Sequence, residues 1–474
     1  MLHHSLVTIW PKAKTHQCIA LSLAVLLLTG CGSSPLATPP PTRVVAIPTL
    51  TLPQPTHTAG PSATVTVKLT KPSSPEATVK VTDLSPPTAT LAPTITPRSE
   101  EPDPTPTLQE ATPTATHTPR SRPLRMMSPE YGMQAFLWWR PKDAGTRDLG
   151  LIEDAGFGWV KQNFGWRDIE GAGRGIFDWS RTDLIVKFTE DAGLDMLTRL
   201  DFQPQWAGGG YPTNGPPDNY QDFGNFLAAV AARYKGRIRA YQIWNEPNLA
   251  RDWGGRRPNP AEYAALLKVA YQSIKAVDPQ AMVISAGLSP TTRWDDTAMP
   301  DAEFLRRMYQ AGARPWFDVL GVHATGWKSP PEADPAAVAR DPNLHNPGDT
   351  ATVPEDLRRV YCFRHVEDLR QIMVQYGDAD KQVAVLEFGW TTDPIHPDYS
   401  WFAVTEQQQA DYLVGAYKYA REHWSPWIGL MCLIYISDPD WTEQNEQYWW
   451  AITWPGYPEP DLRPAYEAIK AMPK

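Results

Sequence analysis

Short apolar runs alternate with longer amphipathic stretches over most of the chain after Met133. Eight runs have the length and alternation of strands, and they cover residues 133–138, 159–165, 195–202, 240–245, 281–286, 317–323, 382–388 and 428–436. Between them, apolar residues recur at helical spacing, most clearly in residues 221–234, 260–277, 303–311, 357–376, 406–423 and 464–471. Strands that alternate with helices are typical of βα units and a parallel sheet.

Eight such units predict an α/β protein with a (β/α)8 barrel whose loops carry insertions. The alternative is an open, doubly wound sheet. No Gly-x-Gly-x-x-Gly motif follows the first predicted strand, so the sequence lacks the usual dinucleotide signature of that fold.

Aromatic residues restrict the folded part of the chain to its C-terminal side. Of the 51 aromatic residues, only Trp10 precedes Tyr131. A segment without aromatic residues cannot bury enough apolar surface to offset its chain entropy. We therefore expect one large domain over residues 126–474.

The first residues have the features of an export signal. Lys12 and Lys14 precede a short apolar run that ends in Leu28-Thr29-Gly30-Cys31. This string resembles a bacterial lipobox, in which the cysteine becomes the lipidated first residue of the mature protein. The sequence predicts a signal peptide over residues 1–30, lipidation at Cys31 and a place outside the bacterial cell membrane. An ordinary cleaved signal is the alternative.

Residues 31–125 form the next predicted segment. Residues 32–125 hold 20 of the 49 prolines and 21 threonines. Pro/Thr-rich sequence favours extended backbone and does not form a packed core. We expect a disordered stalk that holds the domain away from the membrane.

Charge and cysteine content exclude several function classes. The formal net charge is −9, and basic residues do not cluster with aromatic residues as nucleic-acid binding requires. Beyond Cys18 and Cys31 only Cys362 and Cys432 remain; they could pair, but two separate buried thiols fit their apolar surroundings better. No His/Cys cluster has metal-ligand spacing. We expect a neutral carbohydrate substrate, a monomer, no metal and no cofactor.

Two glutamates stand where the reactive residues of such a barrel are expected, at the C-terminal ends of strands. Ala240-Tyr241-Gln242-Ile243-Trp244-Asn245-Glu246-Pro247 is a strand that stops at Glu246, because Pro247 cannot donate to the ladder. Glu387 lies near the end of an otherwise apolar strand. An ionisable group there is costly unless it has a use. Two carboxyl groups about 5 to 5.5 Å apart can carry out retaining glycoside hydrolysis.

The motifs Trp244-Asn245-Glu246-Pro247 and Leu386-Glu387-Phe388-Gly389-Trp390 resemble those of the large retaining clan of (β/α)8 glycosidases that includes families 5 and 39. The resemblance covers most of residues 130–474. It implies that Glu246 is the general acid/base, that Glu387 is the nucleophile and that Asn245 binds the 2-hydroxyl of the substrate.

Three further residues are candidate substrate contacts. His323 ends the sixth predicted strand at a clan position near the nucleophile, although the sequence has His323-Ala324-Thr325 where many relatives carry His-x-Tyr. Tyr435 stands where many relatives place a tryptophan under the sugar. Trp390 follows Glu387 closely and is the first choice among eight tryptophans that could stack on sugar rings. These are Trp138, Trp139, Trp206, Trp327, Trp390, Trp441, Trp449 and Trp450.

Two functions other than glycoside hydrolysis are also compatible with the sequence. A non-catalytic carbohydrate-binding barrel would keep the fold without the chemistry, and a transglycosylase would use the same two glutamates with a sugar as acceptor. β-Xylosides, xylan and β-glucans are the substrates that the family resemblance favours. His365 and Glu367 are interpreted as part of a solvated helix face.

Overall fold

The computed structural model describes residues 124–208 and 214–474. The predicted signal peptide, Cys31 and nearly all of the Pro/Thr-rich segment lie outside the described residues. No helix within the described ranges is both long enough and apolar enough to span a bilayer.

Eight parallel strands close into a barrel in which each strand pairs with its neighbours in sequence and β1 pairs with β8. The strands are β1 (Glu130–Gln134), β2 (Trp159–Gly165), β3 (Asp195–Asp201), β4 (Ala240–Ile243), β5 (Met282–Ile284), β6 (Val319–Thr325), β7 (Gln382–Gly389) and β8 (Ile428–Leu433). The predicted (β/α)8 fold is confirmed, and each predicted strand overlaps an observed one.

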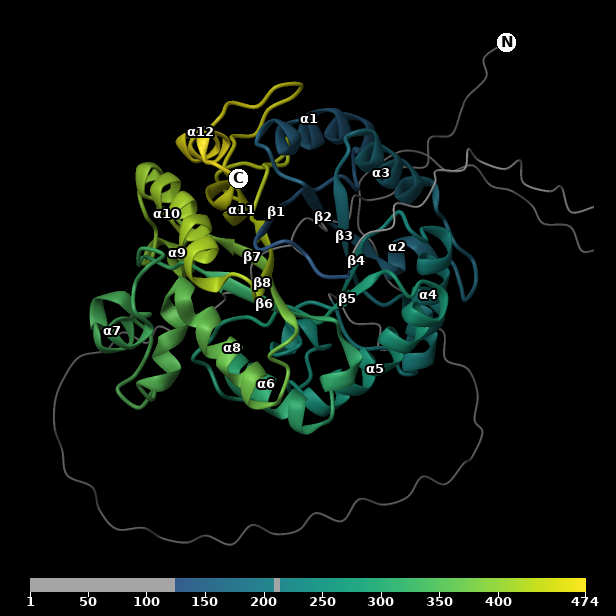
Figure 1. Cartoon of the computed structure of the whole chain (residues 1–474), viewed down its shortest axis with the longest axis horizontal. Coiled ribbons are helices and arrows are strands. Elements are labelled where there is room, and N and C mark those ends of the chain that lie inside the picture. The colour runs from purple at the N-terminus through teal and green to yellow at the C-terminus, as the bar shows by residue number, and fades with distance from the viewer. Residues whose placement is uncertain (1–123, 209–213) are drawn as a thin grey trace, which may run out of the picture. The chain divides into compact units, whose positions relative to one another are not determined.

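Helices surround the barrel (Figure 1). Within the described ranges the α-helices are α1 (Pro141–Asp154), α2 (Trp166–Glu170), α3 (Ser180–Asp191), α4 (Tyr220–Arg233), α5 (Pro260–Val277), α6 (Asp301–Gln310), α7 (Pro335–Arg340), α8 (Val366–Gln375), α9 (Pro397–Ser400), α10 (Glu406–Tyr419), α11 (Glu446–Trp450) and α12 (Pro464–Ala471). The large apolar core lies between the outer faces of the strands and these helices.

One predicted helix is wrong over its first half. Instead of one helix over residues 357–376, the chain forms two short 3₁₀ turns, Asp356–Tyr361 and Phe363–His365, separated by the extended residue Cys362, and α8 begins only at Val366. Residues 360–363 are all buried, and four consecutive buried residues cannot share one face of a helix. The thiols of Cys362 and Cys432 are both buried and unpaired, as predicted.

The inside of the barrel has two levels. Toward the strand starts, it is filled by Trp159, Leu197, Ala240, Leu386 and other apolar residues of one cluster, which we call the apolar layer. Side chains alternate along a strand, so the next inward positions lie two residues further on. There β2, β3 and β4 carry Lys161, Arg199 and Gln242. We call this level the polar layer.

Candidate active site

The end of β4 is bent by two residues with left-handed backbone. Trp244 and Glu246 have φ of 72° and 39°, on either side of Asn245. Non-glycine residues in this region are strained, and such strain is concentrated at functional sites. The Glu246 amide donates to Gly287 O at 3.1 Å, which fixes the turn. The Glu246 side chain is 2% exposed and points toward β6 and the β4–α5 loop.

A β-bulge directs Glu387 into the barrel. Val322 pairs with Val385 and His323 pairs with Glu387, so Leu386 is an extra residue on β7, and the β7–β8 register shifts at the same point. Leu386 belongs to the apolar layer, and strict alternation would turn the next side chain outward. The bulge restores the inward direction, as bulges beside active sites commonly do.

His323 lies between the two glutamates. Its Nδ1 is 3.0 Å from Glu246 Oε1 and 3.9 Å from Glu387 Oε2. Because both distances start from one atom, the two carboxylate oxygens are at most 6.9 Å apart, the sum of 3.0 and 3.9 Å. The predicted pair therefore meets at one point, although the two residues are separated by 141 positions in sequence.

Two cations of the polar layer hold the other oxygen of Glu387. Lys161 Nζ lies 2.8 Å from Glu387 Oε1, and Arg199 Nη1 lies 3.8 Å from the same atom. Burial alone would raise the pKa of Glu387, but the charges of Lys161, His323 and Arg199 outweigh burial and lower it to about 2. Glu387 is thus ionised at neutral pH, as a nucleophilic carboxylate must be.

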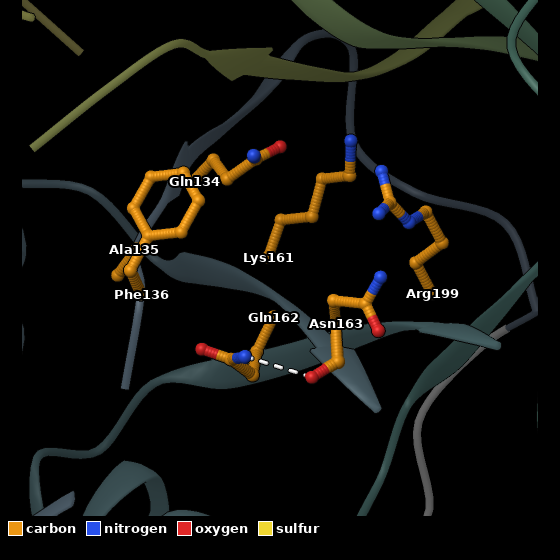
Figure 2. Close-up of a pocket in the computed structure, with 7 residues that line it drawn as sticks. All are labelled: Gln134, Ala135, Phe136, Lys161, Gln162, Asn163 and Arg199. Carbon is orange, nitrogen blue, oxygen red and sulfur yellow. Dashed lines mark hydrogen bonds between the residues drawn. The ribbon is translucent and has the colours of Figure 1, made fainter. Parts of the chain in front are cut away.

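A small pocket opens beside this ion pair, between β1, β2 and β3. Figure 2 shows that Gln134, Lys161, Asn163 and Arg199 extend toward one another there; Ala135, Phe136 and Gln162 also line the pocket. Among the described residues, Gln134 Oε1 in this pocket and Gln242 Oε1 in the polar layer are buried and have no hydrogen-bond partner. Buried polar atoms of this kind are costly unless a polar ligand satisfies them.

Asn245 and Tyr435 adjoin this site in different ways. Asn245 is 7% exposed and accepts a hydrogen bond from Gln242 Nε2 at 3.4 Å, so it lies at the edge of the polar layer next to Glu246. Tyr435 is 1% exposed, and its ring packs on Phe136 at 5.3 Å between centroids. Tyr435 supports the pocket wall through Phe136 and is not among the residues that line the pocket.

The prediction that Trp390 stacks on a sugar ring is wrong. Trp390 is fully buried, its Nε1 donates to Ser329 O at 2.9 Å, and it packs against Phe363 and Tyr412. A Cβ atom on Gly326 would come within 1.8 Å of its ring. With both faces packed in the core, Trp390 has no face on which a sugar could stack.

The interpretation of His365 is also wrong. His365 is 5% exposed and lies 3.0 Å from both Asp301 Oδ2 and Asp368 Oδ2. Burial would lower the pKa of His365, but the two carboxylates raise it to about 10. His365 therefore joins the starts of α6 and α8 as a buried cation. In the parts of the chain that the structure describes, no three His, Cys, Asp or Glu side chains are grouped to hold a metal ion.

Lys161 and Arg199 were not predicted as site residues from the sequence. A signal was present, because both are ionisable residues inside predicted strands, the same feature that drew attention to Glu387. Arg251 was not predicted either; it lies on the 3₁₀ turn Ala250–Asp252 after β4, and its Nη2 lies 3.2 Å from Glu246 Oε2. No pattern in a loop sequence indicates that contact.

Searches found no matching family model and no matching curated protein. Solved structures with the same fold were found. A family 39 glycoside hydrolase from Bacteroides cellulosilyticus is 19% identical, with a TM-score of 0.54, 74% of this chain covered and 64% of that chain covered. The chain therefore spans just under two thirds of the length of that protein.

Two further solved structures are similar. A family 39 β-xylosidase from Caulobacter crescentus is 16% identical, with a TM-score of 0.50 and coverage of 73% of this chain and 72% of that chain. GH5_18 from Streptomyces cattleya, in complex with GlcNAc, is 15% identical, with a TM-score of 0.51 and coverage of 73% and 79%. The resemblance stated from the motifs is thereby confirmed at the level of the (β/α)8 fold.

Proposed function

We propose that this protein is a retaining β-glycosidase that hydrolyses O-glycosidic bonds of an oligo- or polysaccharide through a covalent glycosyl-enzyme. The observation that carries the proposal is the meeting of Glu246 and Glu387 at His323 Nδ1. Their facing oxygens lie no more than 6.9 Å apart. This upper limit includes the separation of about 5 to 5.5 Å that a double displacement uses and excludes most of the range of roughly 6.5 to 9.5 Å that inversion uses.

The chemistry follows from the contacts of each glutamate. Glu387 attacks the anomeric carbon through Oε2, while Lys161 and Arg199 hold Oε1. As the new C–O bond forms, the bond to the leaving oxygen breaks, and Glu246 transfers its proton to that oxygen. In the second step Glu246 takes a proton from water, water attacks the anomeric carbon, and Glu387 departs as a carboxylate.

The proposed substrate is a neutral β-linked sugar. The two cations beside Glu387 are balanced by Glu387 and by Asp201, which lies 3.1 Å from Arg199 Nε, so the pocket has no excess charge for an anionic sugar. β-Xylosides, xylan and β-glucans are the first choices, since the fold is shared with a family 39 β-xylosidase.

Removal of either glutamate tests the proposal. Glu387→Gly and Glu246→Ala should each reduce hydrolysis of a 4-nitrophenyl β-glycoside by several orders of magnitude, because each deletes a reacting group. Azide should restore turnover and give the α-glycosyl azide with Glu387→Gly and the β-glycosyl azide with Glu246→Ala. The matched control is Glu190→Gln, a carboxylate on α3 that is paired with Arg237 outside the barrel, which should leave rates unchanged. Unchanged rates in the first two variants would refute the assignment.

We also propose that the protein acts outside the cell membrane, held by lipid at Cys31. The support is the order of positive charge, apolar run and Leu28-Thr29-Gly30-Cys31 in the sequence. Mass spectrometry of the mature N-terminus should find diacylglycerol on Cys31, and Cys31→Ala should release the protein from membranes. Membrane retention of Cys31→Ala would contradict the anchor without affecting the proposed activity.

A further inference from the structure

The two oxygens of Glu246 have different neighbours. Oε1 lies 3.0 Å from His323 Nδ1, and the His323 side chain is 2% exposed. Oε2 lies 3.2 Å from Arg251 Nη2, and the Arg251 side chain is 39% exposed. A leaving group arrives from solvent, so it reaches Glu246 at Oε2, on the side where Arg251 lies.

The backbone that carries Arg251 is well anchored. Ala250 N donates to Thr297 O at 2.8 Å, and Trp244 Nε1 donates to Asp252 O at 2.8 Å. The guanidinium has a second carboxylate partner within this turn, because Arg251 Nε lies 3.2 Å from Asp252 Oδ2. A long side chain on a fixed backbone can leave Oε2 by rotation while Asp252 retains it.

We propose that Arg251 forms the binding site for the leaving group: the leaving-group oxygen takes its position at Glu246 Oε2, and the guanidinium, retained by Asp252, donates hydrogen bonds to neighbouring hydroxyls of the leaving group. This inference rests on the proposed function. It makes Arg251 a specificity-determining residue that favours a sugar, rich in hydroxyl acceptors, over an apolar leaving group. Arginine has five donors in a planar fork and keeps its charge, which suits this task.

Residues of two other loops reach the same place. Tyr399, on α9 after β7, forms a hydrogen bond with Glu446, on α11 after β8. Burial raises the pKa of Glu446 to about 7, and the nearby charge of Arg251 opposes that rise. Since β4 lies opposite β8 in the closed barrel, these groups converge over its mouth. The leaving-group side is thus bordered by polar groups from three loops.

A matched pair of substrates tests the role of Arg251. One is the 4-nitrophenyl β-glycoside that the wild-type protein cleaves fastest, whose leaving group has no sugar hydroxyls; the other is the β-linked disaccharide of the same sugar. Arg251→Met should lower kcat/KM for the disaccharide by about 10-fold or more relative to kcat/KM for the nitrophenyl glycoside, since a charged hydrogen bond to the sugar leaving group is lost. Arg251→Lys should recover part of the loss, mainly in KM.

The control is Arg256→Met, in the same loop but paired with Glu262, which should not change the ratio of the two rates. Equal losses on both substrates, or none on the disaccharide, would overturn the assignment of Arg251. A wild-type protein that cleaves only the nitrophenyl glycoside would overturn it as well, while the retaining chemistry of Glu246 and Glu387 would stand. A wild-type protein that cleaves no β-glycoside would instead refute the proposed function, and this inference with it.

Discussion

The apolar layer and the polar layer of the barrel are built from the same strands but serve different purposes. In the apolar layer, β2 and β3 contribute Trp159 and Leu197; two residues further on they contribute Lys161 and Arg199 to the polar layer. The apolar layer gains stability by removing surface from water. The polar layer gives up part of that gain, because buried charges are costly even when paired. The end of the barrel where the strands bury ions is therefore the end that is built for function.

Replacement of Lys161 should have the largest effect. Lys161→Met should lower activity on the order of 100-fold, because Glu387 loses the contact that fixes its direction. It should also lower the free energy of unfolding by about 3–5 kcal/mol, since a buried carboxylate loses its partner. Initial rates on a 4-nitrophenyl glycoside and urea denaturation measure the two quantities.

The double variant Lys161→Met with Glu387→Leu sharpens the same comparison. The double variant replaces the buried ion pair with two apolar side chains. Its free energy of unfolding should therefore return to that of the wild type or exceed it by about 1–4 kcal/mol, while activity stays lost. A double variant as unstable as the single one would mean that Lys161 matters for packing and not for charge.

A change in the apolar layer should lower the stability of the protein without lowering its activity. Trp159 is 2% exposed, and Arg239 lies over its ring at 4.5 Å from the centroid. Trp159→Ala should cost about 3–5 kcal/mol of unfolding free energy through the cavity that it leaves. Well below the midpoint of unfolding, kcat should match that of the wild type. A fall in kcat comparable to that of Lys161→Met would break the distinction between the layers.

The sequence predicted the barrel and the two glutamates because hydrophobic period and strand ends are local signals. Glu387 points inward only because Leu386 bulges out of register, and no residue type announces that bulge. Trp390 was misassigned for a related reason: a tryptophan close to the proposed nucleophile in sequence is as easily packed in the core, and Gly326 makes room for it there. The contacts of Lys161 and Arg251 form only when strands and loops that are distant in sequence come together in the closed barrel. The hydrophobic periodicity of the sequence does not predict such contacts.

The smallest expected effect is on the pH dependence of the free energy of unfolding, which should differ between variants of the two layers. The pKa of Glu387 is lowered from 4.5 to about 2, so its ionised form stabilises the folded state fully above about pH 4.5 and loses this contribution as the pH falls through 2. The full contribution is about 3 kcal/mol. In urea denaturation the stability difference between wild type and Glu387→Gln should be constant from pH 7 to 5 and should shrink between about pH 4.5 and 3. The stability difference between wild type and Trp159→Ala should not shrink over this pH range, because Trp159→Ala leaves the Glu387 ion pair unchanged. If both differences shrink together, acid destabilises the barrel as a whole, and protonation of Glu387 in the Lys161–Glu387 pair is not the cause.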